Sequence, residues 1–296
     1  MIKYIITGGA GFIGSHLVQA LVKKNKKVVV LDNLSTGRLD NIKKYRNNKK
    51  FLKCDISKKG KWINEFNSKC YVFHLAALAD IVPSIQNPEA YFSSNVNGTF
   101  NVLQTAKSAG VKRFIYIASS SCYGIPDQYP TPETTEISPQ YPYALTKRLG
   151  EELVMHWAKV YKLPALSLRF FNVYGPRQPL KGQYAPVIGL FEEQAKRGEP
   201  LTIVGDGEQR RDFTHVNDVV EANMNAMMTN YSGMVVNVGT GVNHSVNEVA
   251  SYISDNTVNI PERPGEARET LANIKRANNL LDWEPKITLE DYFDPN

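Results

Sequence analysis

The sequence contains no run of eighteen apolar residues, so no segment is long enough to cross a membrane as a helix. It begins with a short strand-like segment instead of the charged and apolar regions of a signal peptide. Cysteine is scarce, because Cys54, Cys70 and Cys122 are the only three, and they lack the spacing of metal ligands. We therefore expect a cytoplasmic protein with no metal site and no membrane association.

Acidic residues are also few, since 29 Asp and Glu face 35 Lys and Arg and leave a net charge of +6. The excess gathers in lysine-rich stretches at 23–27, 43–50 and 58–61. Such stretches can bind nucleic acid, but no aromatic stacking pattern or nucleic-acid-binding motif accompanies them. We interpret them as solvated loops and helix faces, and we expect no nucleic-acid partner.

Short apolar runs alternate with helical patterns through most of the chain. Strands are expected near residues 2–6, 28–31, 51–53, 71–74, 113–118, 165–170 and 235–238, and later helices near 187–197 and 216–228. This alternation predicts an α/β fold with a parallel sheet covered by helices on both faces. Ligands of such sheets bind beyond the carboxyl ends of the strands.

A glycine-rich turn separates the first strand from a helical pattern over residues 12–22. Its glycines fit two spacings of a dinucleotide-binding loop, Gly9, Gly11 and Gly14 or Gly8, Gly11 and Gly14. Glycine at these positions allows a tight turn and close approach of the backbone to a pyrophosphate at the helix N-terminus. The second strand ends in Asp32, where a carboxylate would bind the adenosine ribose. Because that charge would repel the 2′-phosphate of NADP, the pattern favours NAD.

Tyr143 and Lys147 lie four residues apart in a helical pattern that continues to Tyr161. Residues at this spacing share one face of a helix. A free tyrosine has a pKa of about 10, and a neighbouring cation lowers it by favouring the phenolate. The pair therefore predicts an acid/base device.

Several further motifs occur in order: Asp55-Ile56, His74-Leu75-Ala76-Ala77, Asn95-Val96-Asn97-Gly98-Thr99, Ser119-Ser120-Ser121-Cys122-Tyr123-Gly124, Arg169-Phe170-Phe171-Asn172-Val173-Tyr174-Gly175-Pro176, Arg211-Asp212-Phe213 and Arg263-Pro264-Gly265-Glu266. Together with the glycine loop and the Tyr143–Lys147 pair, they resemble the extended short-chain dehydrogenase/reductases, in particular the NAD-dependent nucleotide-sugar epimerase/dehydratase family. The resemblance runs from residue 2 to about residue 293.

The resemblance implies a Rossmann doubly wound parallel sheet with a smaller, discontinuous α/β substrate domain. The NAD-binding domain would comprise residues 1–175 and about 213–241, and the nucleotide-sugar-binding domain about 176–212 and 242–296. The resemblance also implies a homodimer, in which the helix after Asn95 and the helix from Tyr143 pair with their counterparts. That contact would bury Leu149, Leu153 and Trp157.

The resemblance further assigns residues to three roles. The catalytic residues would be Tyr143 as the base, Ser119 as its hydroxyl partner, and Lys147, which would also bind the nicotinamide ribose. NAD would contact Gly8, Gly11, Phe12, Ile13, Gly14, Asp32, Asn33, Asp55, Ile56, Ala76, Ala77, Asn95, Tyr143, Lys147 and Phe171. The nucleotide sugar would contact Ser119, Ser120, Asn172, Arg211, Arg263 and Glu266, with the two arginines holding its diphosphate.

Some of these residues also have plainer explanations. Ser119 has two serine neighbours that could be confused with it, and Arg211 and Arg263 could be surface arginines. Cys122 is better explained as a small buried side chain than as a catalytic thiol. His74 and His215 are expected to be structural, because neither has the partners of a catalytic triad.

The reaction within the family is inferred from the two residues directly after Ser119. Related 4,6-dehydratases carry an acidic pair there, and decarboxylases tend to carry a glutamate, whereas this chain has Ser120 and Ser121. The serine-rich version resembles 4-epimerases of UDP-sugars. Residues 175–178 and 182–188, with the small Thr270, further resemble epimerases of N-acetylated UDP-sugars. A dehydratase, a decarboxylase, a reductase or a non-catalytic NAD-binding relative are the alternatives.

Overall fold

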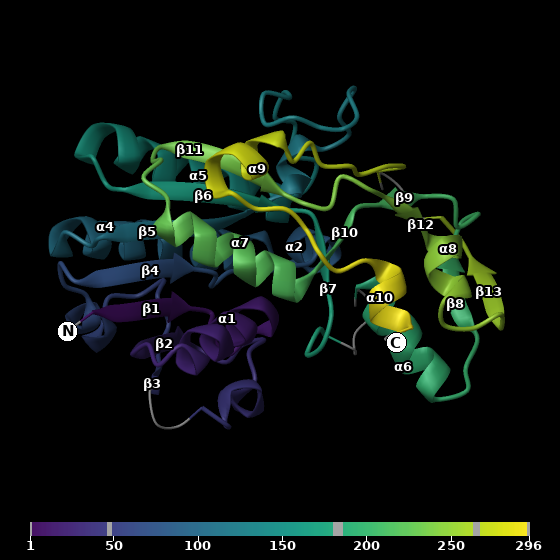
Figure 1. The fold of residues 1–296 in the computed structure, drawn as a ribbon, viewed down its shortest axis with the longest axis horizontal. Helices are drawn as coiled ribbons and strands as arrows, with labels where there is room; N and C mark the ends of the chain where they lie inside the picture. The colour runs from purple at the N-terminus through teal and green to yellow at the C-terminus, as the bar shows by residue number, and fades with distance from the viewer. Residues whose placement is uncertain (1, 46–48, 180–185, 263–266, 295–296) are drawn as a thin grey trace.

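Apolar, largely branched side chains form the strands of a seven-stranded parallel sheet (Figure 1). This computed structural model describes residues 2–45, 49–179, 186–262 and 267–294. The strands of the sheet are β1 (Lys3–Thr7), β2 (Val28–Asp32), β3 (Lys49–Lys53), β4 (Cys70–His74), β5 (Arg113–Ser119), β6 (Ala165–Phe170) and β11 (Met234–Val238). Their order is β11-β6-β5-β4-β1-β2-β3. Strands β2 and β3 follow β1 on one side, and β4, β5, β6 and β11 are added on its other side, so the order of connection switches sides between β1 and β4. The predicted doubly wound Rossmann sheet is confirmed.

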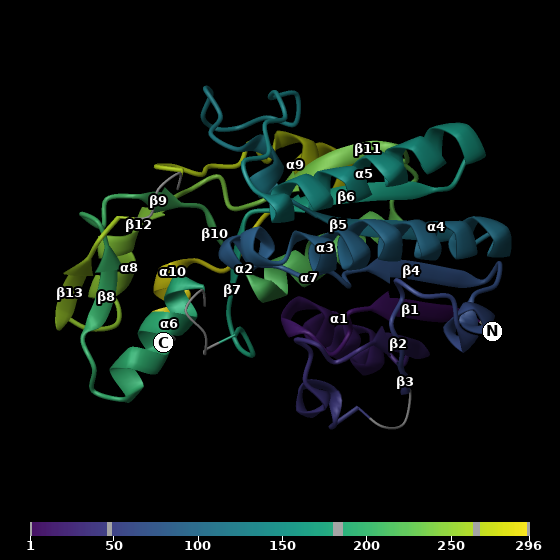
Figure 2. The ribbon, with the colours of Figure 1, turned by 180° about the vertical axis from the view of Figure 1, so that it is seen from behind.

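Amphipathic helices cover both faces of this sheet. Helices α1 (Phe12–Lys23) and α7 (Val216–Met228) lie on the face seen in Figure 1, and α4 (Gly98–Ala109) and α5 (Pro142–Tyr161) lie on the face seen in Figure 2. Each face has its own buried core, one including Ile6, Leu17 and Val219 and the other including Ile5 and Phe114. Burying two faces explains why the strands read as continuous apolar runs.

Short elements connect the strands. They are η1 (Leu39–Ile42), η2 (Lys61–Glu65), α2 (Ile81–Gln86), α3 (Pro88–Tyr91), the π-helix η3 (Phe92–Asn97) and η4 (Ser120–Tyr123). The π-helix continues directly into α4, and π-helical turns are often found at functional sites.

Most of the remaining elements lie beyond the carboxyl ends of the strands (Figure 1). Three two-stranded sheets occur there: β7 (Asn172–Tyr174) with β10 (Phe213–His215), β9 (Arg210–Arg211) with β12 (His244–Ser245), and β8 (Leu201–Val204) with β13 (Thr257–Ile260). Helices α6 (Val187–Lys196), α8 (Val246–Ser251) and α10 (Leu289–Phe293) pack with them around a separate apolar core, and α9 (Lys275–Leu281) packs beside β11 and α7. The domain boundaries inferred from the sequence remain a prediction.

Candidate active site

The glycine loop between β1 and α1 holds the chain in close contact with the loop after β4. Gly8 has a φ of +68°, and a Cβ atom there would lie 2.8 Å from the backbone of Ala76. At Gly14 a Cβ atom would lie 2.2 Å from the carbonyl oxygen of Gly8. Only glycine fits either position without displacing the backbone, so the sequence pattern reflects a steric requirement.

The first turn of α1 is suited to an anion. Its N-cap is Gly11, which has no side chain to bond the amide groups, and the first turn contains no acidic residue. The partial positive charge of the helix N-terminus is therefore left uncompensated by the helix's own side chains. This arrangement fits the pyrophosphate of a dinucleotide, which would lie against the amides of Phe12 and Ile13.

Asp32 is fixed at the carboxyl end of β2. Its carboxylate accepts hydrogen bonds from the backbone N–H groups of Ala10 (2.9 Å) and Leu34 (2.8 Å), one on each oxygen. Each oxygen keeps a lone pair that could accept from a ribose hydroxyl. The structure therefore suits the ribose-binding role predicted for Asp32.

We expect the protein to bind NAD at least tenfold more tightly than NADP, a difference of about 1.4 kcal/mol. Asp32→Ala should reduce this preference, because the charge that repels a 2′-phosphate is removed. Titration of both dinucleotides checks this, with Asp40→Ala, an exposed carboxylate in η1, as the control. Equal affinity of the unaltered protein for both dinucleotides would contradict the assignment.

The other predicted cofactor residues occupy several environments. The Asp55 carboxylate accepts from the Ser57 N–H (2.9 Å) and the Ser57 hydroxyl (2.7 Å), and Ile56 is buried against Gly98. The Ala76 N–H donates to the Thr7 hydroxyl (3.1 Å). Asn33 lies at the exposed end of β2, Ala77 follows Ala76, and Phe171 is buried beside Cys122, Tyr123 and Ala272.

Asn95 has a role that the sequence did not reveal. Its side-chain amide donates to the Leu78 carbonyl (3.0 Å) and the Thr146 hydroxyl (3.0 Å), while its side-chain carbonyl oxygen accepts from the Leu78 N–H (2.8 Å). Both N–H donors are thus used within the protein. Asn95 ties the loop after β4 to α5, one turn from the Tyr143 position.

Ser119 and Tyr143 come together from β5 and α5. A hydrogen bond joins their side chains, and Ser119 also accepts from the Ser121 N–H (3.2 Å) and the Ser121 hydroxyl (2.8 Å). Ser120 and Ser121 belong to η4, the short helix that starts immediately after the strand. Of the three adjacent serines, Ser119 is the one whose hydroxyl acts on the Tyr143 phenol, and its catalytic role stays a prediction.

Lys147 is buried behind this pair. Its ammonium group donates to the Ile117 carbonyl and lies 4.5 Å from the centre of the Tyr116 ring. Burial lowers the pKa of Lys147 to about 7, and the charge of Glu151 opposes this. Burial also raises the pKa of Tyr143, although the hydrogen bond to Ser119 acts in the opposite direction. The ammonium group of Lys147 contacts Ile117 and Tyr116, and the expectation that Lys147 and the positive ring of NAD together favour the Tyr143 phenolate stays a prediction.

The predicted substrate residues are only partly within the described chain. Asn172, at the start of β7, accepts a hydrogen bond from the Thr270 hydroxyl (3.1 Å), so these two residues lie side by side. Arg211 is 9% exposed and donates to the Arg210 carbonyl (2.9 Å). Arg263 and Glu266 lie outside the described residues.

Asp212, next to Arg211, anchors the segments around these residues. It is fully buried, and its carboxylate accepts from the backbone N–H groups of Thr240 (2.7 Å), Gly241 (3.0 Å) and Ala272 (3.0 Å). These bonds join three segments that are distant in the sequence, and they fix Arg211 relative to the segments around Thr240 and Ala272.

The residues expected to be structural behave in that way. His74 lies between the Thr7 hydroxyl (2.7 Å) and the Thr99 hydroxyl (2.9 Å), and burial lowers its pKa to about 3. His215 accepts from the Asn217 N–H at the start of α7 (3.3 Å). Cys122 is 2% exposed, and burial raises its pKa to about 12, which disfavours the reactive thiolate.

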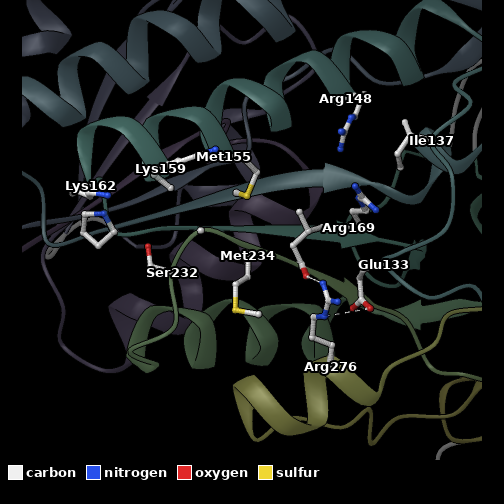
Figure 3. A pocket seen from close by; sticks show the side chains of 14 residues that line it. Glu133, Ile137, Arg148, Met155, Lys159, Lys162, Arg169, Ser232, Met234 and Arg276 are labelled. Atoms are coloured by element: carbon white, nitrogen blue, oxygen red, sulfur yellow. Dashed lines mark hydrogen bonds and ion pairs between the residues drawn. The ribbon is translucent and has the colours of Figure 1, made fainter.

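A groove of about 950 Å³ lies away from this site, between α5, β6, β11 and α9 (Figure 3). It contains none of the predicted site residues. Arg148 and Arg169, which line it, both bind the fully buried Glu151 behind them, at 2.6 Å in each case. Glu151 lies one turn after Lys147 on α5. This spacing places the two side chains on the same face of the helix, and it is the signal by which the sequence could have indicated Glu151.

Comparison with known proteins agrees with this geometry. Residues 4–239 match the NAD dependent epimerase/dehydratase family. A UDP-glucose 4-epimerase of Mycolicibacterium smegmatis is 36% identical over 98% of this chain and 95% of its own length. UDP-glucuronic acid decarboxylase 4 of Arabidopsis thaliana is 34% identical over 98% of this chain and 66% of its own length.

Solved structures are also similar over nearly the whole chain. UDP-glucose 4-epimerase of Thermotoga maritima, solved with UDP-glucose, has a TM-score of 0.93 and 36% identity, covering 99% of this chain and 96% of its own. UDP-glucuronic acid 4-epimerase of Bacillus cereus, solved with UDP-glucuronic acid and NAD, has a TM-score of 0.90 and 32% identity, covering 99% and 97%. The chain belongs to the NAD-dependent epimerase/dehydratase family, and its cofactor is NAD.

Proposed function

We propose that this protein is an NAD-dependent 4-epimerase of a UDP-sugar. The observation that carries the proposal is the hydrogen-bonded pair of Ser119 and Tyr143 at the end of β5, with Lys147 one turn further along α5. The similar proteins named as 4-epimerases of UDP-glucose and UDP-glucuronic acid support it.

The proposed mechanism assigns one task to each side chain. Tyr143, as phenolate, takes the proton from the C4 hydroxyl of the sugar, while Ser119 orients that hydroxyl and passes the proton. When bound, NAD supplies the hydride acceptor and a positive charge that favours ionisation of Tyr143. Arg211, with Arg263, holds the diphosphate while the 4-keto sugar turns to present its other face.

The residues after Ser119 favour epimerisation over elimination or decarboxylation. Ser120 and Ser121 provide no carboxylate in η4, where a dehydratase or a decarboxylase of this family would be expected to have one. A decarboxylase remains the second candidate, because one of the relatives carries that name. The small Thr270 beside Asn172 would leave room for an N-acetylated sugar, whereas residues 182–185 of the related motif lie outside the described residues.

A substrate deuterated at C4 tests the proposal. An epimerase returns the hydride to the carbon that lost it, so the product should keep its deuterium at C4 with no net release of NADH. Mass spectrometry and NMR of the product locate the label, and loss of about 18 or 44 mass units would instead report dehydration or decarboxylation. Deuterium at C6, or on free NADH, would contradict epimerisation.

We also propose that the protein acts as a homodimer in the cytoplasm and that its product serves polysaccharide biosynthesis. Phe92, Phe100 and Leu145 are 47%, 41% and 46% exposed on η3, α4 and α5, the elements expected to pair. Trp157, which was expected to be buried by the partner, is already buried within one subunit, where it packs against Phe100 and donates to Gln104 (3.2 Å).

Leu145→Glu should convert the dimer to a monomer, because an isologous contact would bury the new carboxylate twice in an apolar surface. Sedimentation velocity at micromolar concentration measures the change. Leu39→Glu is the matched control, since Leu39 is 48% exposed on η1, away from α4 and α5. A monomeric unaltered protein would contradict the proposed assembly.

A further inference from the structure

The ammonium group of Lys147 is buried without a carboxylate bound to it. Lys147 is 4% exposed, its Nζ donates to the Ile117 carbonyl, and no ion pair of Lys147 occurs within the described part of the chain. Glu151, one turn further along α5, is bound instead to Arg148 and Arg169, at 2.6 Å in each case. A buried ammonium group needs a partner that offsets its loss of water. The Ile117 carbonyl satisfies only one of its three N–H donors.

The ring of Tyr116 lies against this ammonium group. Tyr116 is in β5, and Nζ of Lys147 lies over the face of its ring, 4.5 Å from the ring centre. Tyr116 is 1% exposed, so the contact is shielded from water. The face of an aromatic ring carries partial negative charge and attracts a cation, most strongly when both groups are desolvated. Tyr116 therefore supplies a partner for the charged form of Lys147.

Tyr116 is fixed in this place by its hydroxyl group. The hydroxyl donates to the backbone carbonyl of Lys147 (3.1 Å), so the ring is bonded to the same residue whose ammonium group lies on its face. This close approach depends on Gly150, where a Cβ atom would lie 2.3 Å from the Tyr116 hydroxyl oxygen. Glycine destabilises the interior of a helix, so its position within α5 is explained by the space that Tyr116 occupies.

The ionisable groups around Lys147 do not replace this contact. His74, at the end of β4, is neutral near pH 7, because burial and the charge of Lys147 lower its pKa to about 3. Tyr143 lies one turn before Lys147, and burial raises its pKa. Glu151 is the carboxylate whose charge favours the ammonium form, while burial lowers the pKa of Lys147 to about 7. A change in the stabilisation of this ammonium group therefore alters its charge near neutral pH.

We propose that Tyr116 is a positioning residue of the reaction, whose ring face holds Lys147 at the end of β5 as a charged ammonium group. The inference rests on the proposed function, in which a positive charge at Lys147 favours the phenolate of Tyr143. A neutral amine would provide no such charge. The attraction comes from the ring, whereas the hydroxyl places the ring, so the two contributions can be separated by substitution.

Titration of Lys147 in proteins that differ in this ring tests the inference. Protein containing lysine isotope-labelled at Cε is followed by NMR against pH, with and without NAD, and Lys147→Met identifies the signal. Tyr116→Phe keeps the ring, so the pKa of Lys147 should stay within a few tenths of a unit. Pentafluorophenylalanine in place of Tyr116 keeps the ring shape but removes the negative charge of its face. The pKa of Lys147 should then fall by about one pH unit or more.

The same proteins should differ in the alkaline limb of their kcat profile with a UDP-sugar. A weaker attraction lowers the pKa of the ammonium group, so its charge and its support of the Tyr143 phenolate are lost at a lower pH. The limb should lie about one pH unit lower with pentafluorophenylalanine than with Tyr116→Phe. Tyr116→Leu, which has no ring, should give the same shift and serves if the fluorinated protein does not fold.

Phe114→Leu is the matched control. Phe114 is 0% exposed, lies two residues before Tyr116 on the same face of β5, and belongs to the same buried core. Its loss should destabilise the fold by a similar mechanism, yet the titration of Lys147 and the kcat profile should keep their positions on the pH axis.

Four results would count against these proposals. Equal pKa values of Lys147 in Tyr116→Phe and the fluorinated protein overturn the inference and leave the epimerase proposal standing. A similar fall in Phe114→Leu also overturns it, because loosening of the core would then be the cause. A fall in the pKa of Lys147 without a shift of the kcat profile overturns the role of Tyr116 in the reaction. Failure of the unaltered protein to convert any UDP-sugar overturns the proposed function, while the NMR titration still decides whether the ring holds the ammonium group.

Discussion

Tyr143→Phe should lower kcat by a factor of about 100 or more, because it removes the only group assigned to take the proton from the C4 hydroxyl. The ring is retained, so its edge-on contact with Tyr91 and the fold should persist. Dinucleotide binding should survive as well, since the glycine loop and Lys147 are unchanged. Steady-state kinetics with a UDP-sugar and a separate NAD titration measure the two effects.

Tyr161→Phe serves as the control for this loss. Tyr161 ends the same helix, is 45% exposed, and keeps its aromatic contact with Lys107 when the hydroxyl is removed. It should retain full turnover. If Tyr143→Phe keeps activity within a few-fold of the unaltered protein, Tyr143 is not the base.

Glu151→Ala should reduce the free energy of unfolding by about 3–5 kcal/mol, the usual effect of removing one partner from a buried ion pair. Glu151 is fully buried and accepts from Arg169 (2.6 and 3.0 Å), Arg148 (2.6 Å) and the Ser167 hydroxyl (2.9 Å). Its loss would leave the guanidinium group of Arg169, which is 2% exposed, without its carboxylate. Urea unfolding followed by circular dichroism gives the difference.

Glu152→Ala is the matched control, because Glu152 is the next residue, is exposed, and pairs with the same Arg148 at 3.1 Å. Its effect should be about 1 kcal/mol or less. A similar decrease in the free energy of unfolding in both variants would show that burial of the Glu151 ion pair does not contribute to stability.

The stabilisation by Glu151 should decrease as the pH falls. Burial raises the pKa of Glu151, but hydrogen bonds and charge from Arg169 outweigh it, so the net pKa lies below the usual 4.5. Stability from Glu151 is therefore fully present above about pH 4.5 and is lost as the pH falls through the lower, folded-state pKa. The difference between the unaltered protein and Glu151→Ala should shrink over that acidic range.

The sheet and its helices could be predicted from the sequence because the apolar patterns of these segments match the residues that the fold buries. Helix α7 has an amphipathic period, strand β2 is a continuous apolar run buried on both faces, and the residues expected at 216–228 and 28–31 match Val216–Met228 and Val28–Asp32 closely. The π-helix Phe92–Asn97 was not anticipated, because its extra residue per turn arises from packing against α5 and α3 and leaves no periodic signal.

The site was predictable where a side chain's role depends on its position along one element. Ser119 at a strand end and Tyr143 on a helix are of this kind. Asn95 was assigned to the cofactor, whereas its bonds to Leu78 and Thr146 depend on how three segments meet in space.

The position of β11 at the edge of the sheet affects how the chain folds during synthesis. Strand β11 pairs with β6, yet β7 to α7 lie between them in the sequence. While the ribosome makes that intervening stretch, the outer edge of β6 has no strand beside it, and an open edge can pair with another chain. The sheet is complete only when Met234–Val238 has emerged, so the edge of β6 is open to pairing with another chain until then.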